Sequence, residues 1–223
     1  IAGNYSSGSL AVLPVKANGS LDSAVQVIQH EGHSVVEGRQ DDPHVHATVL
    51  SSDNKTLYVP DLGLDKLMIY KFNNKTGKLT DAPMPFALTE PGAGPRHFDI
   101  HPNNKYAYLI EELTGTVSVF EIYKDGSLES IQNISSLPRD FDGDIGSADI
   151  HVSPDGKFLY ASNRGESNTI GIFKINPSTG LLTWVDHQST MGKTPRNFNF
   201  DPTGNFLLVA NQNTHDIIIF KRD

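Results

Sequence analysis

The segment SPDGKFLYA, residues 153–161, places a polar turn directly before an apolar strand, and the chain contains three further copies of this pattern. The other copies are SSDNKTLYV from Ser51, HPNNKYAYL from His101 and DPTGNFLLV from Asp201. The aligned turn residues are separated by 50, 52 and 48 positions, and they are Asn54, Asn104, Gly156 and Gly204. Self-similarity at one nearly fixed period is typical of a repeat architecture.

Each repeat contains two further features of β-structure. Apolar runs such as LMIYKF (residues 67–72) and IGIFKI (residues 170–175) are rich in β-branched and aromatic residues, which strands favour. A glycine turn then leads into another strand, at Gly19, Gly77, Gly126 and Gly180. Each repeat is therefore predicted to form four antiparallel strands in about 45–50 residues, the length of one β-propeller blade. Helical periodicity is nowhere sustained, which argues against a helix-pair solenoid.

The predicted fold is all-β, a β-propeller of four-stranded antiparallel blades formed as a single domain over residues 1–223. Strand signals along the sequence number 18: three, then three sets of four, then three. We place the blades approximately at residues 1–40 (partial), 41–92, 93–144, 145–192 and 193–223 (partial). Neither four nor five closed blades of four strands fits this count, so we expect part of a larger propeller with apolar blade faces exposed at both ends.

Composition limits the function classes. The net charge of −8 argues against a nucleic-acid partner, and no apolar run approaches the 18 residues that a membrane span needs. We therefore expect no membrane partner and a cytoplasmic location. The absence of cysteine excludes disulfides and thiolate chemistry. The histidine spacing matches no zinc motif, and the acidic run from Asp140 lacks the Glu of a calcium loop, so we expect no metal and no cofactor.

Arginine or histidine occurs near the start of the first strand in four successive predicted blades. These first strands supply His46, then Arg96 and His97, then Asp149 and His151, then Arg196. In a propeller the first strands line the central channel, so residues about 50 positions apart are predicted to converge around one axis. A strand that fills a dry core would carry Val or Ile at these positions. The pattern therefore favours a functional cluster over isolated structural residues that each bond a neighbouring carbonyl.

The second strands contribute further polar residues. A carboxylate held among arginines and histidines can stay ionised and act as a general base, whereas arginines bind anionic groups and stabilise an oxyanion. The candidate catalytic residues are Glu112, His46 and His151. The candidate substrate-binding residues are Arg96, His97, Arg164, Arg196, Asp149 and Gln212. The alternative role for Glu112 is a salt bridge that ties adjacent blades together.

Three segments resemble the seven-bladed propeller lactonase family, and the similarity extends over essentially all 223 residues. They are GAGPRHFDIHPNNKYAYLIEEL from Gly92, ADIHVSPDGKFLYASNR from Ala148 and TPRNFNFDPTGNFLLVANQ from Thr194. Members of this family include bacterial 6-phosphogluconolactonases and fungal 3-carboxy-cis,cis-muconate lactonizing enzymes. The resemblance implies a seven-bladed propeller in the full-length protein, of which this chain covers about four to five blades.

The resemblance also implies roles for particular residues. The fungal cycloisomerase branch uses a His, two arginines and a Glu, which match His46, Arg96, Arg164 and Glu112 of this chain. The phrase Gly-Pro-Arg-His, which includes His97, is closer to the phosphogluconolactonase branch, and His151 also matches that branch.

The leading functional prediction is therefore hydrolysis of 6-phospho-D-glucono-1,5-lactone to 6-phosphogluconate, a step of the pentose phosphate pathway. The partner would be a small anionic sugar lactone, held by channel arginines and histidines, with water activated by Glu112 or a histidine. The first alternative is a carboxymuconate cycloisomerase. The second is a non-catalytic propeller that serves as a binding scaffold, because a fold alone does not determine an activity.

Overall fold

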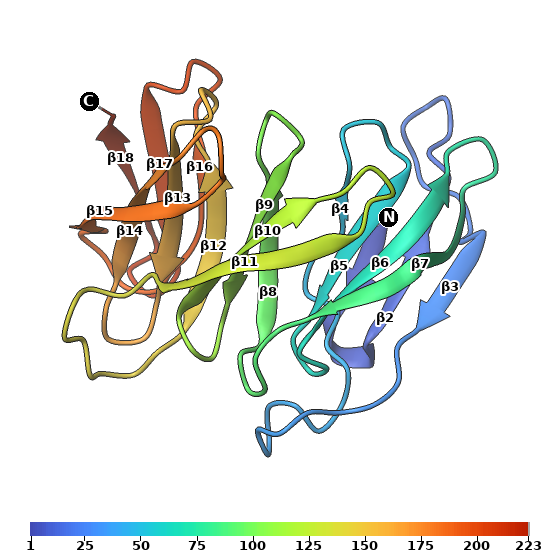
Figure 1. The fold of residues 1–223 in the computed structure, drawn as a ribbon, viewed down its shortest axis with the longest axis horizontal. Helices are drawn as coiled ribbons and strands as arrows, with labels where there is room; N and C mark the ends of the chain where they lie inside the picture. Colours follow the sequence, from blue (N-terminus) through green and yellow to red (C-terminus); the bar gives the residue numbers. More distant parts are fainter. Residues whose placement is uncertain (223) are drawn as a thin grey trace. The chain divides into compact units, whose positions relative to one another are not determined.

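The computed structural model describes residues 1–222 and is built almost entirely from β-strands (Figure 1). Within these described residues, eighteen strands form five sheets with three, four, four, four and three strands in chain order, which confirms the all-β prediction. The helical structure within residues 1–222 is one 3-10 turn, Tyr5–Ser7. No helix in this described part of the chain has the length and apolar composition needed to cross a membrane. The chain divides into two compact units, one formed by Ile1–Pro95 with Tyr123–Leu128 and the other by Arg96–Ile122 with the residues from Glu129 onward.

The first unit contains a three-stranded and a four-stranded sheet. The three-stranded sheet consists of β1 (Ala2–Asn4), β2 (Ser9–Val12) and β3 (Gln26–Gln29). The four-stranded sheet consists of β4 (Val49–Leu50), β5 (Thr56–Asp61), β6 (Lys66–Asn73) and β7 (Lys78–Leu88). Strands that follow one another in sequence pair antiparallel in both sheets. Their inward residues, among them Leu10, Leu57 and Leu79, form one buried cluster.

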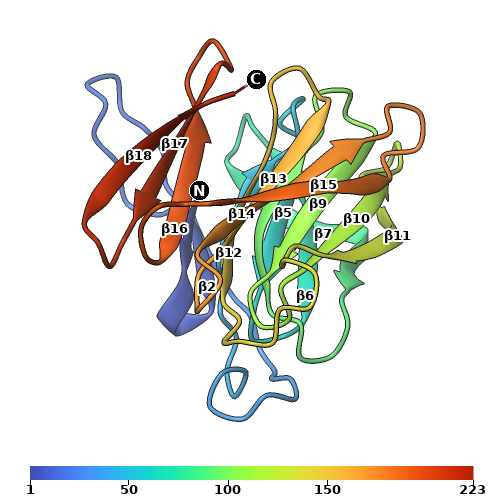
Figure 2. The same cartoon turned by 90° about the vertical axis from the view of Figure 1, so that its left-hand side faces the viewer.

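The second unit contains the other sheets. The first of them consists of β8 (Pro95–Ile100), β9 (Tyr106–Glu111), β10 (Thr116–Ile122) and β11 (Leu128–Ser135), whose end residues Pro95 and Leu128 belong to the first unit. The next consists of β12 (Ser147–Val152), β13 (Phe158–Asn163), β14 (Thr169–Ile175) and β15 (Leu182–Ser189). The last consists of β16 (Pro195–Phe200), β17 (Phe206–Asn211) and β18 (Asp216–Lys221), which run side by side in Figure 2. The strands keep chain order in every sheet.

The repeated polar segment forms the same turn in all four copies. The aligned turn residues all adopt a left-handed backbone, with φ of 55° at Asn54, 58° at Asn104, 70° at Gly156 and 72° at Gly204. Asparagine and glycine are the residues that tolerate this conformation best, which explains why they alternate at this position. The preceding acidic residue supports the turn, since Asp155 Oδ1 accepts a hydrogen bond from the Lys157 backbone N–H at 3.1 Å.

Tyrosines on the second strands connect one repeat to the glycine turn of the next. The Tyr58 hydroxyl donates to the carbonyl of Gly126 at 3.0 Å, and the Tyr108 hydroxyl donates to the carbonyl of Gly180 at 3.0 Å. Both rings are buried, so these bonds satisfy hydroxyls that would otherwise be desolvated without a partner. A Cβ atom at Gly180 would overlap the ring of Tyr106, so a glycine is needed where the turn packs against β9.

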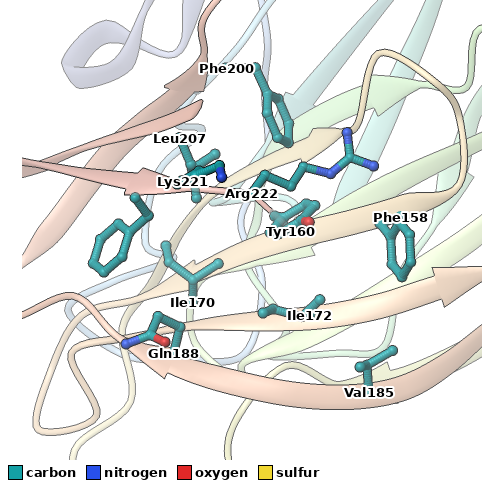
Figure 3. A pocket seen from close by; sticks show the side chains of 11 residues that line it. Phe158, Tyr160, Ile170, Ile172, Val185, Gln188, Phe200, Leu207, Lys221 and Arg222 are labelled. Atoms are coloured by element: carbon teal, nitrogen blue, oxygen red, sulfur yellow. The ribbon is translucent and has the colours of Figure 1, made fainter. Parts of the chain in front are cut away.

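An apolar groove lies between the last two sheets of the second unit (Figure 3). Phe158, Tyr160 and Ile172 line one side of it, and Leu207 and Phe220 line the other. Phe158 is only partly buried because it faces this open groove. The outer face of β18 is also apolar and exposed, with Ile217 at 64% and Ile219 at 62% of full exposure.

Candidate active site

The first strands of the three sheets in the second unit are joined by acidic side chains. Asp99 Oδ2 of β8 accepts a hydrogen bond from the backbone N–H of Val152 in β12 at 2.7 Å. Asp149 Oδ2 of β12 accepts one from the backbone N–H of Phe198 in β16 at 3.0 Å. These bonds place β8 beside β12 and β12 beside β16. Residues at matching positions of successive repeats are thereby brought together, as the repeat pattern predicts.

Two arginines share one carboxylate at the start of β8. Arg96 Nε donates to Glu112 Oε2 at 2.7 Å, and Arg164 Nη2 lies 3.0 Å from the same oxygen. Arg96 Nη1 also donates to the backbone carbonyl of Ala148 at 2.5 Å. Arg96 is 1% exposed, whereas the side chains of Glu112 and Arg164 are 11% and 13% exposed. The group carries two positive charges and one negative charge, so it has an excess positive charge.

The pKa of Arg96 reflects the charges and the burial of this arginine cluster. Burial and the nearby positive charge of Arg164 lower the pKa of Arg96 to about 10, although Glu112 partly offsets both effects. The charge of Arg196 on β16 acts in the same direction. Arg96 nevertheless remains protonated at neutral pH. Arg164 is held in place independently, because its Nε donates to the carbonyl of Gly146 at 2.8 Å.

A second cluster is centred on Asp149, which is 1% exposed. His97 Nδ1 donates to Asp149 Oδ1 at 2.6 Å, and His151 Nε2 lies 3.3 Å from Asp149 Oδ2. The Asn197 side-chain amide donates to Asp149 Oδ2 at 2.6 Å. Backbone N–H groups of Ile150 and Phe198 donate to the same carboxylate, each at 3.0 Å. One buried carboxylate therefore orients three polar side chains from three strands.

The pKa values in this second cluster follow from these contacts. Burial alone would raise the pKa of Asp149, but the hydrogen bonds from His151 and His97 and their charges hold it well below its usual range. Burial alone would lower the pKa of His151, but its contacts with Asp149 and the charge of Asp99 raise it above its usual value. Burial raises the pKa of Asp99. Asp149 is therefore an ionised acceptor, and His151 has an increased tendency to carry a proton.

The sequence missed Asn197. It occupies the position in β16 that Asp149 occupies in β12 and His97 in β8, as the segments PRHFDIHP, SADIHVSP and PRNFNFDP show when aligned. This shared position in three consecutive repeats was the signal that could have found it. Among residues 1–222, no group of His, Asp and Glu side chains has the arrangement of a metal site.

The other predicted residues lie apart from these bonds. Arg196 is exposed on β16, and Gln212 is exposed after β17, where its backbone N–H donates to the Thr194 carbonyl at 2.8 Å. His46 belongs to the first unit. Its backbone N–H donates to the carbonyl of Pro60 at 3.0 Å, and its ring meets the edge of Tyr5 at a centroid distance of 5.3 Å. The convergence of His46 with the arginine cluster stays a prediction.

Comparisons with known proteins place this chain in a family. The family model described as "Lactonase, 7-bladed beta-propeller" matches residues 1–223. A protein from Formosa agariphila named 6-phosphogluconolactonase is 41% identical over 222 residues, and one of the same name from Bacillus subtilis is 42% identical over 226 residues. The alignments cover 99% and 100% of this chain but 62% of each relative. The chain thus spans less than two thirds of the length of these relatives.

The solved structures include a similar one, described as a periplasmic gluconolactonase from Pseudomonas aeruginosa. It is 42% identical in sequence and superposes with a TM-score of 0.93, over 99% of this chain and 62% of that chain. The repeat spacing, the four-stranded sheets and the full-length family match agree with one another. The chain belongs to the lactonase family of seven-bladed β-propellers.

Proposed function

We propose that this chain supplies an active site that hydrolyses 6-phospho-D-glucono-1,5-lactone to 6-phosphogluconate. The observation that carries the proposal is the arginine cluster, in which Arg96 and Arg164 share the single carboxylate of Glu112. Its excess positive charge complements a phosphorylated substrate, because guanidinium groups bind phosphate through paired, charge-assisted hydrogen bonds. Relatives that carry the name of this activity support the same substrate.

The arginines have two different roles: one supports Glu112, and the others contact the substrate. Arg96 is almost completely buried and bonded to Glu112 and to the Ala148 carbonyl, so it orients the carboxylate rather than the substrate. Arg164 is more accessible, and Arg196 is exposed on β16. Arg164 and Arg196 are therefore the groups that bind the phosphate or the lactone carbonyl. A guanidinium beside that carbonyl also stabilises the oxyanion that forms when water attacks.

Hydrolysis requires two proton movements. A base removes a proton from water as the water oxygen bonds to the lactone carbonyl carbon, and a tetrahedral oxyanion forms. When this intermediate collapses, the bond to the ring oxygen breaks and that oxygen takes up a proton. Glu112 Oε2 is engaged by both guanidinium groups, through a hydrogen bond from Arg96 and an ion pair with Arg164, so this oxygen is already occupied. Proton transfer therefore falls to histidine in this site.

The direct test is hydrolysis of freshly prepared 6-phosphogluconolactone by the purified protein, with the spontaneous rate subtracted. An enzyme-dependent rate that falls when Arg164 is changed to Lys supports the proposal, because lysine keeps the charge but not the paired hydrogen bonds. A matched control is Arg222→Lys, since Arg222 lies on the apolar groove at the end of β18. A rate equal to the spontaneous rate at all protein concentrations contradicts the proposal.

A second candidate is cycloisomerisation of a carboxymuconate. The observation that favours it is the grouping of Arg96, Glu112 and Arg164, the residue types that the resemblance implies for the fungal cycloisomerase branch. Its substrate carries several carboxylates and needs a proton donor but no water. Loss of the ultraviolet absorbance of 3-carboxy-cis,cis-muconate on mixing with the protein would support this activity. No change in absorbance, together with lactone hydrolysis, leaves the hydrolase as the function.

We also propose the cytoplasm as the location, where the phosphorylated lactone would be formed and consumed. The relative from Pseudomonas aeruginosa is named as periplasmic, so an experiment must determine which of the two compartments contains this protein. Fractionation of cells that express the natural gene, with the protein detected by antibody, distinguishes them. Recovery with periplasmic marker enzymes would contradict the proposed location and would favour an unphosphorylated sugar lactone.

A further inference from the structure

We propose that His97 is the catalytic base that removes the proton from the attacking water, and that Asp149 is the positioning residue that fixes its ring. His151, which contacts the same carboxylate, supplies the proton to the ring oxygen that leaves. This assignment rests on the proposed lactone hydrolysis and replaces Glu112 as the candidate base. It also gives a role to both histidines that contact Asp149.

Asp149 is built as an orienting group rather than as a base. Its carboxylate accepts hydrogen bonds from the backbone N–H groups of Ile150 and Phe198 and from the side chain of Asn197. Donors that converge on a carboxylate stabilise its charged form, and Asp149 is almost completely buried. An ionised and immobile acceptor of this kind holds the proton of a neighbouring imidazole on one nitrogen. This is the role that the aspartate has in a Ser-His-Asp triad.

His97 has the geometry of the base that such an acceptor orients. Its Nδ1–H donates to Asp149 Oδ1 at 2.6 Å, which places the lone pair of the neutral ring on Nε2. Its side chain is 27% exposed, so the ring is accessible while its orientation is fixed from the buried side. Developing positive charge on the ring during proton abstraction is stabilised by the same carboxylate. Together these features fix the orientation of the His97 ring and leave it accessible.

His151 is in a different environment and suits the opposite role. Its Nε2 lies 3.3 Å from Asp149 Oδ2, and its Nδ1 lies 4.0 Å from Asp99 Oδ2. Both nitrogens therefore face carboxylates, which favours the imidazolium form, and its pKa is raised accordingly. Its side chain is 29% exposed, similar to that of His97. The 4.0 Å between Nδ1 and Asp99 Oδ2 exceeds a hydrogen bond, so the Nδ1–H of the imidazolium can donate its proton to the departing alkoxide oxygen.

The proton-transfer groups adjoin the arginine cluster. Arg96 and His97 are consecutive in β8, and their partners Ala148 and Asp149 are consecutive in β12. The two clusters are therefore one residue step apart along both strands, and a register shift between Ser147 and Ile150 interrupts the alternation that would otherwise point consecutive side chains of β12 to opposite faces. The substrate anion bound by Arg164 and the carbonyl attacked next to His97 would then belong to one small molecule.

Charged groups adjoin His97 on its own strand and on the neighbouring strand β12. The groups on β8 and β12 are Arg96, Asp99, Asp149 and His151, and the adjoining cluster adds Glu112 and Arg164. The Asn197 contact to Asp149 is neutral. Because a base must be unprotonated and an acid protonated to act, the two assigned roles predict that kcat decreases at both low and high pH.

The experiment measures kcat and KM against pH for His97→Gln, Asp149→Asn and His151→Gln in the full chain. A general base contributes about 10²–10⁴-fold, so His97→Gln should lose that much in kcat while KM changes little. The low-pH decrease should also disappear in this variant, and added imidazole should restore part of the rate. The matched control is His187→Gln, because His187 is exposed on β15. Full kcat with an unchanged low-pH decrease in His97→Gln would overturn the assignment.

A second measurement tests positioning without any substrate. Nitrogen-15 NMR of the histidine rings distinguishes the protonated nitrogen, and we expect His97 to carry its proton on Nδ1 at neutral pH. In Asp149→Asn, or in Asn197→Ala if the first variant does not fold, we expect a mixture of tautomers. Protonation of His97 on Nε2 in the unaltered protein would overturn the role of Asp149, even if lactone hydrolysis is observed. Absence of hydrolysis together with the Nδ1 tautomer would overturn the base assignment and the proposed function but leave the positioning role supported.

Discussion

His97 Nδ1 donates to Asp149 Oδ1 at 2.6 Å, and this bond joins residues that occupy the same position in two successive repeats. The carboxylate then accepts from Asn197, which occupies that position in the next repeat. Three first strands are thus connected by one bonded row of polar side chains. Apolar residues could fill a propeller core at this position, so the polar row is best explained by a role in the proposed reaction.

Glu112→Gln is predicted to destabilise the protein. The substitution leaves Arg96 buried beside Arg164 without a shared negative charge, and breaking a buried ion pair on one side costs about 3–5 kcal/mol. Urea unfolding should show this loss as a lower midpoint. In the double variant Glu112→Gln with Arg96→Met, much of the loss should be recovered, because the uncompensated charge is gone. Glu129→Gln, on an exposed side chain of β11, is the control. Equal stability of Glu112→Gln and the parent chain would contradict the electrostatic role of Glu112.

Arg164→Lys is predicted to raise KM for a phosphorylated lactone. Hydrogen bonds between charged groups contribute about 1.5–3 kcal/mol, which corresponds to roughly 10- to 150-fold in kcat/KM. The effect should decrease in high salt, because the interaction of an accessible charge with an anion is screened. Steady-state kinetics at low and high ionic strength test this. An unchanged KM at low salt would show that Arg164 does not contact the anion.

Stability is predicted to decrease at both ends of the pH range because of Asp149 and His151. The folded-state pKa of Asp149 is lowered, so its stabilising contribution is present above its unfolded pKa of about 3.9 and is lost as pH falls through the folded value. The folded-state pKa of His151 is raised, so its contribution is present below its unfolded pKa of about 6.5 and is lost as pH rises through the folded value.

Urea unfolding at a series of pH values measures these contributions. Asp149→Asn should flatten the acidic part of the stability profile, and His151→Gln should flatten the part near and above neutrality. His187→Gln again provides a control on an exposed histidine. Parallel profiles for His151→Gln and the parent chain would indicate that the pKa of His151 is not raised in the folded state.

Tyr58→Phe and Tyr108→Phe are each predicted to lower the free energy of unfolding by about 1–3 kcal/mol. Both substitutions keep the ring but leave a buried glycine carbonyl without its donor, at Gly126 and Gly180. Tyr5→Phe should have little effect, since Tyr5 is 37% exposed. Thermal or urea unfolding of the three variants in parallel makes the comparison. Equal stability of all three would show that the hydroxyls do not secure the glycine turns.

Much of the fold could be predicted from the repeat. The sequence predicts three strands, then three sets of four strands, then three strands. The five sheets contain these numbers of strands in chain order. The predicted turn positions have the left-handed backbone that Asn54 and Gly156 tolerate. The burial of single strand residues is less predictable, because it depends on what packs over them: the groove between β13 and β18 leaves Phe158 partly open.

The site was less predictable than the fold. The pairing of Glu112 with two arginines followed from placing polar residues at equivalent positions of several repeats. The central role of Asp149 did not follow, because hydrogen bonds between strands about 50 residues apart depend on side-chain orientation that periodicity does not specify. Asn197 was missed for a related reason, since a single exposed asparagine in a strand has no chemical signature of its own. The relation of His46 to these residues remains a prediction.

The central claim is that this site hydrolyses a phosphorylated sugar lactone, and the most direct measurement compares two substrates. Hydrolysis of freshly prepared 6-phosphogluconolactone and of unphosphorylated gluconolactone would be followed by pH-stat, each corrected for its spontaneous rate. We predict at least a roughly 10-fold preference in kcat/KM for the phosphorylated lactone, as expected for one charge-assisted phosphate contact, and loss of that preference in Arg164→Lys. Equal rates for the two lactones, or no rate above the spontaneous one, would contradict the account.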